Sequence, residues 1–250
     1  MKKIIAEDYC QMSLTAAKCV AEYVNLNPDS LLCFAAGNTP MGMFENLINM
    51  QKKGMVDLST VFYAELDEWV GLGYDDQGSC RQVMFDNYYS PAGIPEDRIH
   101  IFDGLDSNSD RQCRQMEKWI FSHGGIGLTV LGIGMNGHIG FNEPNAPDTN
   151  ACFTVKLDEV TKAVSVKYFN KSLPVEFGIT IGWSMLKSAK NIILIADGKK
   201  KAPIVKASLE RPETVNIPAS LMQDHPKLIV ILDKGAASEL EGIVEYNEKY

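Results

Sequence analysis

The stretch from Leu131 to Pro144, L-G-I-G-M-N-G-H-I-G-F-N-E-P, constrains the fold more than any other part of the chain. The apolar, β-branched run Ile126–Leu131 precedes it and has the length of a buried strand. Four glycines then surround His138. Open α/β sheets bind ligands where a strand ends in such a turn, since glycine lets the backbone approach a ligand closely. Two interpretations remain open here: a tight turn with a surface histidine, or a ligand site whose imidazole moves protons.

Strand-like and helical segments alternate along the whole chain, without a low-complexity linker or a repeat. This alternation predicts an α/β fold: one domain over residues 1–250, a Rossmann-like three-layer α/β/α sandwich with a mostly parallel central sheet. The expected strands are 31–36, 60–65, 126–131, 152–157, 179–181, 191–196 and 228–232. The expected helices are 8–24 with Asp8 as N-cap, 41–52, 80–88, 110–123, 158–169, 183–187, 204–209 and 236–246.

The composition limits the class of protein. With 250 residues, 45% of them hydrophobic and 22% charged, the chain can bury a sizeable core. Its net charge of −8 argues against a general binder of nucleic acids or anionic membranes. No stretch approaches the ~18–20 apolar residues of a membrane span, and the first apolar run is too short for a signal peptide. The six scattered cysteines and four histidines lack metal-ligand spacing, so we expect a reduced, cytoplasmic protein without a metal site.

Two other strand ends have features of an anion site. The turn G-N-T-P at residues 37–40 lies between an expected strand and an expected helix, where backbone N–H groups can hold a phosphate. It lacks the G-K-[ST] of a Walker motif, so an ordinary turn is the alternative. Three lysines at 199–201 also lie between a strand and a helix, either as a solvated face or as phosphate ligands. Lys227 precedes the strand 228–232, so we expect it at the opposite end, on the surface.

Two adjacent carboxylates, Asp67 and Glu68, follow the expected strand 60–65. Carboxylates at a strand end are often solvated or cap a helix. In a parallel sheet, however, this end lies on the same edge as the glycine-rich turn. A carboxylate and an imidazole at one edge are the minimum set of groups for proton transfer.

Together these motifs resemble the hexosamine-6-phosphate deaminase/isomerase family, which belongs to the same superfamily as the 6-phosphogluconolactonases. The resemblance extends from about Leu31 to the last strand. Its most specific parts are G-N-T-P at 37–40, L-D-E-W-V-G at 66–71 and G-M-N-G-H-I-G-F-N-E-P at 134–144. It implies an enzyme that isomerises a 2-amino-2-deoxyhexose 6-phosphate and releases ammonia, leaving a ketose 6-phosphate, without a metal or an organic cofactor. A small sugar phosphate is then the expected partner; the family forms monomers and homo-oligomers, and both stay open.

The resemblance also implies residue roles. Asp67 would carry a proton between C2 and C1 of the open-chain sugar, and His138 would assist ring opening. Glu143 would hold His138 in the working tautomer, with Asn136 beside them. The residues expected to bind the substrate and its phosphate are Gly37, Asn38, Thr39, Gly134, Gly137, Lys167 and Lys201.

Two departures from the family pattern affect specificity and regulation. Asn136 stands where members acting on glucosamine 6-phosphate typically have aspartate; an amide can still orient the imidazole but lacks the charge that favours imidazolium. Together with L-D-E-W-V-G-L at 66–72 and I-P-A-S at 217–220, it resembles the galactosamine branch of the family. This favours galactosamine 6-phosphate, with tagatose 6-phosphate as product, ahead of glucosamine 6-phosphate and fructose 6-phosphate. Phe153 and Val155 replace basic residues of allosteric relatives, so we expect no activation by N-acetylglucosamine 6-phosphate.

Two alternatives remain open. A 6-phosphogluconolactonase shares the fold and the glycine–histidine turn, but its pattern lacks F-N-E-P, which supplies Glu143 here. A non-catalytic sugar-phosphate sensor needs only the binding residues. A DNA-binding unit is not expected, because the chain is acidic and only about 30 residues, interpreted as one helix, precede the first expected strand.

Overall fold

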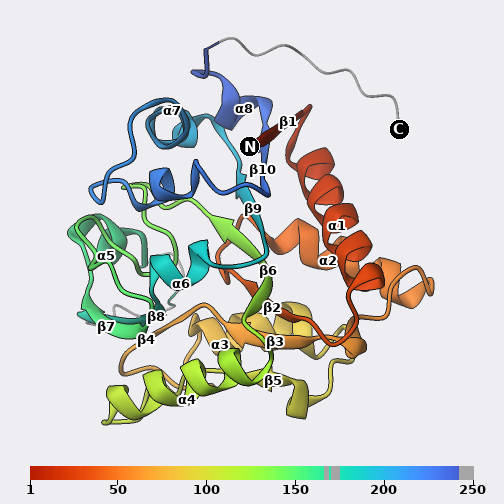
Figure 1. Cartoon of the computed structure of the whole chain (residues 1–250), viewed down its shortest axis with the longest axis vertical. Helices are drawn as coiled ribbons and strands as arrows, with labels where there is room; N and C mark the ends of the chain where they lie inside the picture. Colours follow the sequence, from red (N-terminus) through yellow and green to blue (C-terminus); the bar gives the residue numbers. More distant parts are fainter. Residues whose placement is uncertain (166–168, 170–174, 242–250) are drawn as a thin grey trace.

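The computed structural model describes residues 1–165, 169 and 175–241, and it has three layers, with helices on both faces of a central sheet (Figure 1). This sheet has seven strands, and every neighbouring pair is parallel. Their spatial order is β1 (Lys2–Ala6), β10 (Leu228–Asp233), β9 (Asn191–Ala196), β6 (Ile126–Gly132), β2 (Leu31–Phe34), β3 (Phe62–Glu65) and β5 (Ile99–His100). The predicted fold class is therefore confirmed.

A second, three-stranded sheet lies beside the first. It is antiparallel, in the order β4 (Asp67–Trp69), β8 (Phe177–Ile181) and β7 (Cys152–Lys156). The strands expected at 152–157 and 179–181 are thus present but pair outside the central sheet. Asp67 is the first residue of a strand in this small sheet, only two residues after β3 ends.

The helices divide between the two faces of the central sheet. Their bounds are α1 (Tyr9–Leu26), α2 (Met41–Lys52), α3 (Cys80–Met84), α4 (Ser109–Ser122), α5 (Glu159–Ser165), α6 (Trp183–Lys187), α7 (Ala202–Glu210) and α8 (Lys234–Ala237), with a π-helical turn η2 (Phe85–Tyr89) after α3 and 3-10 turns η1 (Leu58–Thr60), η3 (Glu96–Arg98), η4 (Lys199–Lys201) and η5 (Pro218–Met222). As predicted, the Asp8 side chain caps α1, accepting from the Gln11 N–H at 2.8 Å.

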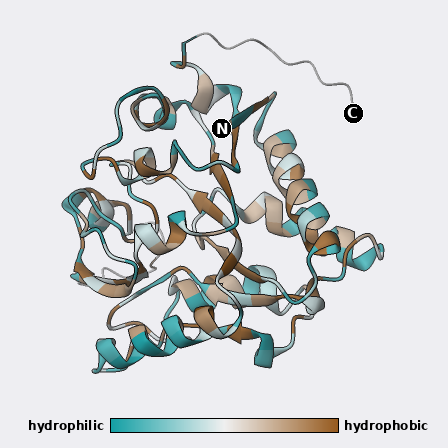
Figure 2. Cartoon of the chain, in the orientation of Figure 1, coloured by the Kyte–Doolittle hydropathy of each residue, from teal (hydrophilic) through white to brown (hydrophobic). Residues whose placement is uncertain are grey.

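Alternation along the strands builds a separate core on each face. In β2, Leu31 and Cys33 pack with α4 and α7, whereas Leu32 and Phe34 pack with α1 and α2. Because every residue of β2 is buried, the strand is a continuous apolar run. Figure 2 shows the same pattern, with hydrophobic strands inside and helices that change from hydrophobic to hydrophilic around their axes. No helix of the described residues is long and apolar enough to cross a membrane.

Two terminal expectations were wrong. The first strand is β1, at the edge of the central sheet, so fewer residues precede the sheet than expected. Within the described part of the helix expected at 236–246, the helical residues end with α8 at Ala237, because the backbone N–H of Glu241 bonds to the Glu210 carboxylate at 2.8 Å instead of to the carbonyl of Ala237. The remainder of that expected helix lies outside the described residues.

The strand order sets the place of the site. The chain passes from β2 to β3 on one side, while β6 lies on the other side of β2 and continues to β9. Such a reversal opens a crevice at the carboxyl ends of the strands, where α/β sheets bind ligands. The turns after β2, β3, β6 and β9 all meet at this edge, because these strands are parallel.

Candidate active site

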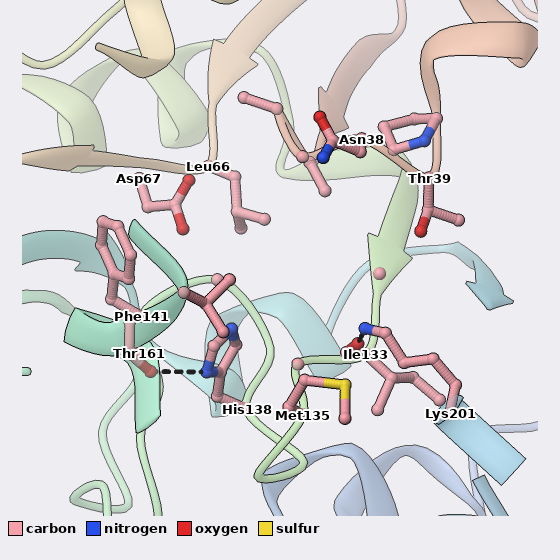
Figure 3. Close-up of a pocket in the computed structure, with 18 of the residues that line it drawn as sticks. Asn38, Thr39, Leu66, Asp67, Ile133, Met135, His138, Phe141, Thr161 and Lys201 are labelled. Carbon is pink, nitrogen blue, oxygen red and sulfur yellow. Dashed lines mark hydrogen bonds between the residues drawn. The ribbon is translucent and has the colours of Figure 1, made fainter. Parts of the chain in front are cut away.

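A cavity of about 690 Å³ occupies this edge, within the size range of small-molecule sites. Figure 3 shows Asp67 and His138 at one end of it and Thr39 and Lys201 at the other. The expected site residues that line the cavity are Gly37, Asn38, Thr39, Asp67, Gly134, His138 and Lys201. Glu143, Asn136 and Gly137 lie behind this lining, and Lys167 lies outside the described residues.

The imidazole of His138 is held by groups from two segments. Its Nδ1 lies 3.1 Å from the Thr161 hydroxyl on α5 and 3.5 Å from a Glu143 carboxylate oxygen (Figure 3 draws the first contact). The Asn136 amide donates to Glu143 at 2.9 Å, and its oxygen accepts from the backbone N–H of His138. The expected direct contact between Asn136 and the imidazole is therefore wrong, because the amide is already bonded to the carboxylate and the backbone. Asn136 therefore reaches the ring indirectly, through Glu143 and through the backbone of His138.

Glu143 is a buried carboxylate beside a histidine. Burial acts to raise its pKa, but the hydrogen bond and charge of His138, with the Asn136 amide, lower the pKa below its ordinary value. An ionised carboxylate next to Nδ1 favours the tautomer that carries its proton there. Nε2 is then the ring nitrogen left to exchange protons.

Neighbouring side chains lie so close to the backbone of the turn that its glycines leave no room for a larger residue. A Cβ at Gly134 would lie 2.4 Å from Cδ2 and Nε2 of His138, so the ring lies directly against the backbone. Gly137 has φ of +87°, a conformation that favours glycine, and packs on Ile217. Gly140, at φ +55°, would place a Cβ 3.4 Å from Asp67 Oδ2. The turn therefore brings its backbone against both the imidazole and the carboxylate.

Asp67 has the electrostatics of a base that works near neutral pH. Burial raises the pKa of Asp67 to about 7, and the negative charges of Glu68 and Glu143 raise it as well. A general base is most effective when its pKa lies near the working pH. Only 8% of the side chain is exposed, and it lines the cavity, so its proton exchange is directed to a bound ligand.

Glu68 faces away from the cavity and ties β4 to α3. Its carboxylate accepts backbone N–H groups of Trp69 at 2.7 Å, Cys80 at 2.9 Å and Arg81 at 2.8 Å. Burial raises the pKa of Glu68 to about 7, although these hydrogen bonds lower it. Two adjacent buried carboxylates thus lie on β4, and only Asp67 lines the cavity.

The turn after β2 and the lysines after β9 form the other end of the cavity. The Thr39 hydroxyl donates to Oδ1 of Asp197 at 2.6 Å, which joins the two turns. The Lys201 ammonium donates to the carbonyl of Ile133. Burial lowers the pKa of Lys201, while the nearby charge of Asp197 acts to raise it. Tyr9, on α1, braces the same turn by accepting from the Gly42 N–H at 2.8 Å.

Three residues of the site belong to no motif that the sequence analysis identified: Thr161, Thr180 and Asp197. Thr180 accepts from the backbone N–H of Phe141 at 3.2 Å, while Thr161 bonds to His138 and Asp197 to Thr39. Asp197 could have been noticed as the residue directly after β9, where parallel strands present their ligands.

Comparison with known proteins shows the family to which the chain belongs. The model of a family described as glucosamine-6-phosphate isomerases/6-phosphogluconolactonase matches residues 9–230. A protein of Halothermothrix orenii named glucosamine-6-phosphate deaminase is 39% identical over 96% of this chain and 100% of its own length. One of the same name from Thermoanaerobacter pseudethanolicus is 38% identical over 95% of this chain and 94% of its own.

Solved structures extend the comparison. A monomeric glucosamine-6-phosphate deaminase, described as a missing link of the NagB superfamily, superposes with a TM-score of 0.91 at 32% identity, covering 96% of this chain and all of that one. A 6-phosphogluconolactonase of Trypanosoma brucei superposes with a TM-score of 0.73 at 16% identity, covering 96% of this chain and 98% of that one. The second likeness concerns the fold alone.

Proposed function

We propose that this chain, which belongs to the family of glucosamine-6-phosphate isomerases and 6-phosphogluconolactonases, isomerises and deaminates a 2-amino-2-deoxyhexose 6-phosphate. The observation that carries the proposal is a buried carboxylate, Asp67, with a pKa near 7, in the same cavity as the imidazole of His138. Carbon-bound proton transfer needs such a base, and ring opening needs a second group that moves protons. Relatives named as deaminases support the same chemistry.

The reaction divides between the two ends of the cavity. The 6-phosphate binds at Gly37, Asn38 and Thr39 with Lys201, and the expected contribution of Lys167 stays a prediction. His138, with Glu143 behind Nδ1, moves a proton at the ring oxygen as the sugar opens. Asp67 then removes the proton at C2 and returns it to C1. The resulting imine at C2 adds water to give a carbinolamine, which expels ammonia and leaves a ketose 6-phosphate.

The configuration of the sugar at C4 is the finer part of the proposal. The sequence favours galactosamine 6-phosphate, and this preference stays a prediction. The relatives compared above are named for glucosamine 6-phosphate, which supports the gluco sugar as a substrate. Asn136 bonds to Glu143 and does not line the cavity, so its influence on substrate choice would have to pass through the His138–Glu143 pair.

The test is ammonia release from both amino sugar phosphates in parallel, with hydrolysis of 6-phosphogluconolactone as the control. The proposal predicts ammonia from at least one sugar and negligible lactone hydrolysis. Faster turnover of the galacto sugar supports the specificity predicted from Asn136, whereas faster turnover of the gluco sugar keeps the reaction and rejects that prediction. Lactone hydrolysis without ammonia release would replace the proposal with a lactonase, and phosphate-ester binding without either reaction would replace it with a sensor.

A further inference from the structure

A carboxylate lies at the end of the cavity where the phosphate is expected to bind. Asp197 directly follows β9 and lines the cavity together with the three lysines of η4. Its Oδ1 accepts from the Thr39 hydroxyl at 2.6 Å, across 158 residues of chain. The same contact that joins the two turns therefore places a negative charge beside the expected anion.

This contact fixes which hydrogen-bonding groups the pair can offer. A threonine hydroxyl has one hydrogen, and in Thr39 it points to Asp197, so the oxygen is left only as an acceptor. An ionised carboxylate also only accepts, and Oδ2 of Asp197 has no hydrogen bond to any described residue. The pair thus presents acceptors and no donor to a ligand.

Positive charge also lies at this end, where Lys199, Lys200 and Lys201 line the cavity. Of these, Lys201 already donates to the carbonyl of Ile133, and burial lowers its pKa. The charged or titratable side chains that line the cavity are Asp67, Cys80, His138, Asp197, Lys199, Lys200 and Lys201. Behind the turn, Asp233 on β10 accepts the Gly198 N–H with both carboxylate oxygens, so its charge is held next to Asp197 as well.

We propose that Asp197 is a specificity-determining residue of the end of the cavity formed by the β2–α2 turn and η4, which we call the phosphate cradle. Asp197 makes this cradle select a phosphate group that still carries a proton. The P–O–H group donates to the acceptors of Asp197 and Thr39, while the remaining oxygens accept from the lysines and the backbone N–H groups of the β2–α2 turn. A fully ionised oxyanion has only acceptors and is repelled by the carboxylate. The inference rests on the proposed function, since it assumes that the cradle binds the 6-phosphate. A phosphate monoester loses its second proton with a pKa of about 6, so substrate affinity falls as pH rises above that value.

The experiment compares methyl phosphate with methyl sulfate, because the two anions have similar size and shape but only methyl phosphate has a proton to donate. Affinities are measured by calorimetry at about pH 5.5 and about pH 8, on the two sides of the phosphate monoester pKa. Methyl sulfate does not titrate there, so any change in its affinity reports protein groups such as Asp67. The ratio of the two affinities isolates the phosphate proton. Asp197→Asn removes the charge at almost constant shape, and Asp197→Ser serves if the first variant does not fold.

We expect the wild-type chain to prefer methyl phosphate over methyl sulfate by roughly 10- to 100-fold at the lower pH, the range of one hydrogen bond to a charged group. The preference shrinks at the higher pH and is lost in Asp197→Asn, which binds methyl sulfate more tightly than the wild-type chain does. Asp67→Asn, the matched control at the other end of the cavity, keeps the preference. Equal affinities in the wild-type chain, or an unchanged preference in Asp197→Asn, would overturn the inference while leaving ammonia release intact. Absence of binding by either anion overturns the phosphate cradle itself.

Discussion

Adding one methyl group at Gly134 should displace the imidazole of His138. The Cβ would lie 2.4 Å from Cδ2 and Nε2, whereas ordinary contact begins at 3.4 Å, so the ring has to move by about 1 Å. A misplacement of about 1 Å in a catalytic group can reduce the rate by about 10²-fold, or about 2.7 kcal/mol of transition-state stabilisation. We therefore expect kcat for ammonia release in Gly134→Ala to fall by about 10²-fold, with phosphate binding retained.

Gly132→Ala is the matched control. It adds the same methyl two residues earlier in the cavity lining, where no atom lies within 4 Å. We expect its kcat to stay within about threefold of the wild-type value, well inside the effect expected at Gly134. Thermal melting shows that both variants are folded. A folded Gly134→Ala variant with near wild-type kcat would refute the role given to the position of the imidazole.

The remaining predictions concern pH, stability and regulation. Because Asp67 must be ionised to accept a proton and its pKa is about 7, kcat/KM should fall as pH drops below that value. Glu68→Gln removes a neighbouring negative charge and should move this fall in kcat/KM to lower pH. An unchanged pH dependence would show that Glu68 does not raise the pKa of Asp67. The raised pKa also means that the folded state holds a proton which the unfolded state releases, so stability is lost as pH rises from 3.8 to about 7. Asp67→Asn should therefore raise Tm at pH 8 by at least about 2 °C, and a lower Tm would contradict the assignment. N-acetylglucosamine 6-phosphate should leave the substrate saturation curve unchanged, and a clear shift would reject the expectation based on Phe153 and Val155.

Most of the central sheet could be predicted from the sequence because its inner strands are continuous apolar runs. β1 was missed because it has only three apolar residues, two lysines at its start and one neighbour, β10. Its stability depends on pairing with a segment more than 200 residues away, which no local pattern records. The small antiparallel sheet was missed for the same reason, since β4 and β8 pair across about 110 residues.

The site was predictable where chemistry lies in consecutive residues. The glycine-rich turn after β6 and the turn after β2 could be placed at one edge, because parallel strands bring their ends together. Thr161 could not be found, since α5 reaches His138 only through the tertiary fold. Asp197 was overlooked because the three lysines after it indicated only positive charge, whereas the structure bonds it to Thr39.

The most direct test of the central claim is transfer of deuterium from C2 to C1, followed by NMR in the wild-type chain and in Asp67→Asn with an amino sugar phosphate that carries deuterium at C2 and that the wild-type chain turns over. The account predicts deuterium at C1 of the ketose product of the wild-type chain and loss of both this transfer and ammonia release in the variant, by roughly 10²- to 10⁴-fold. Binding of inorganic phosphate should be retained in the variant. Transfer at the wild-type rate in a folded Asp67→Asn chain would contradict the account, because the base would then be a different group.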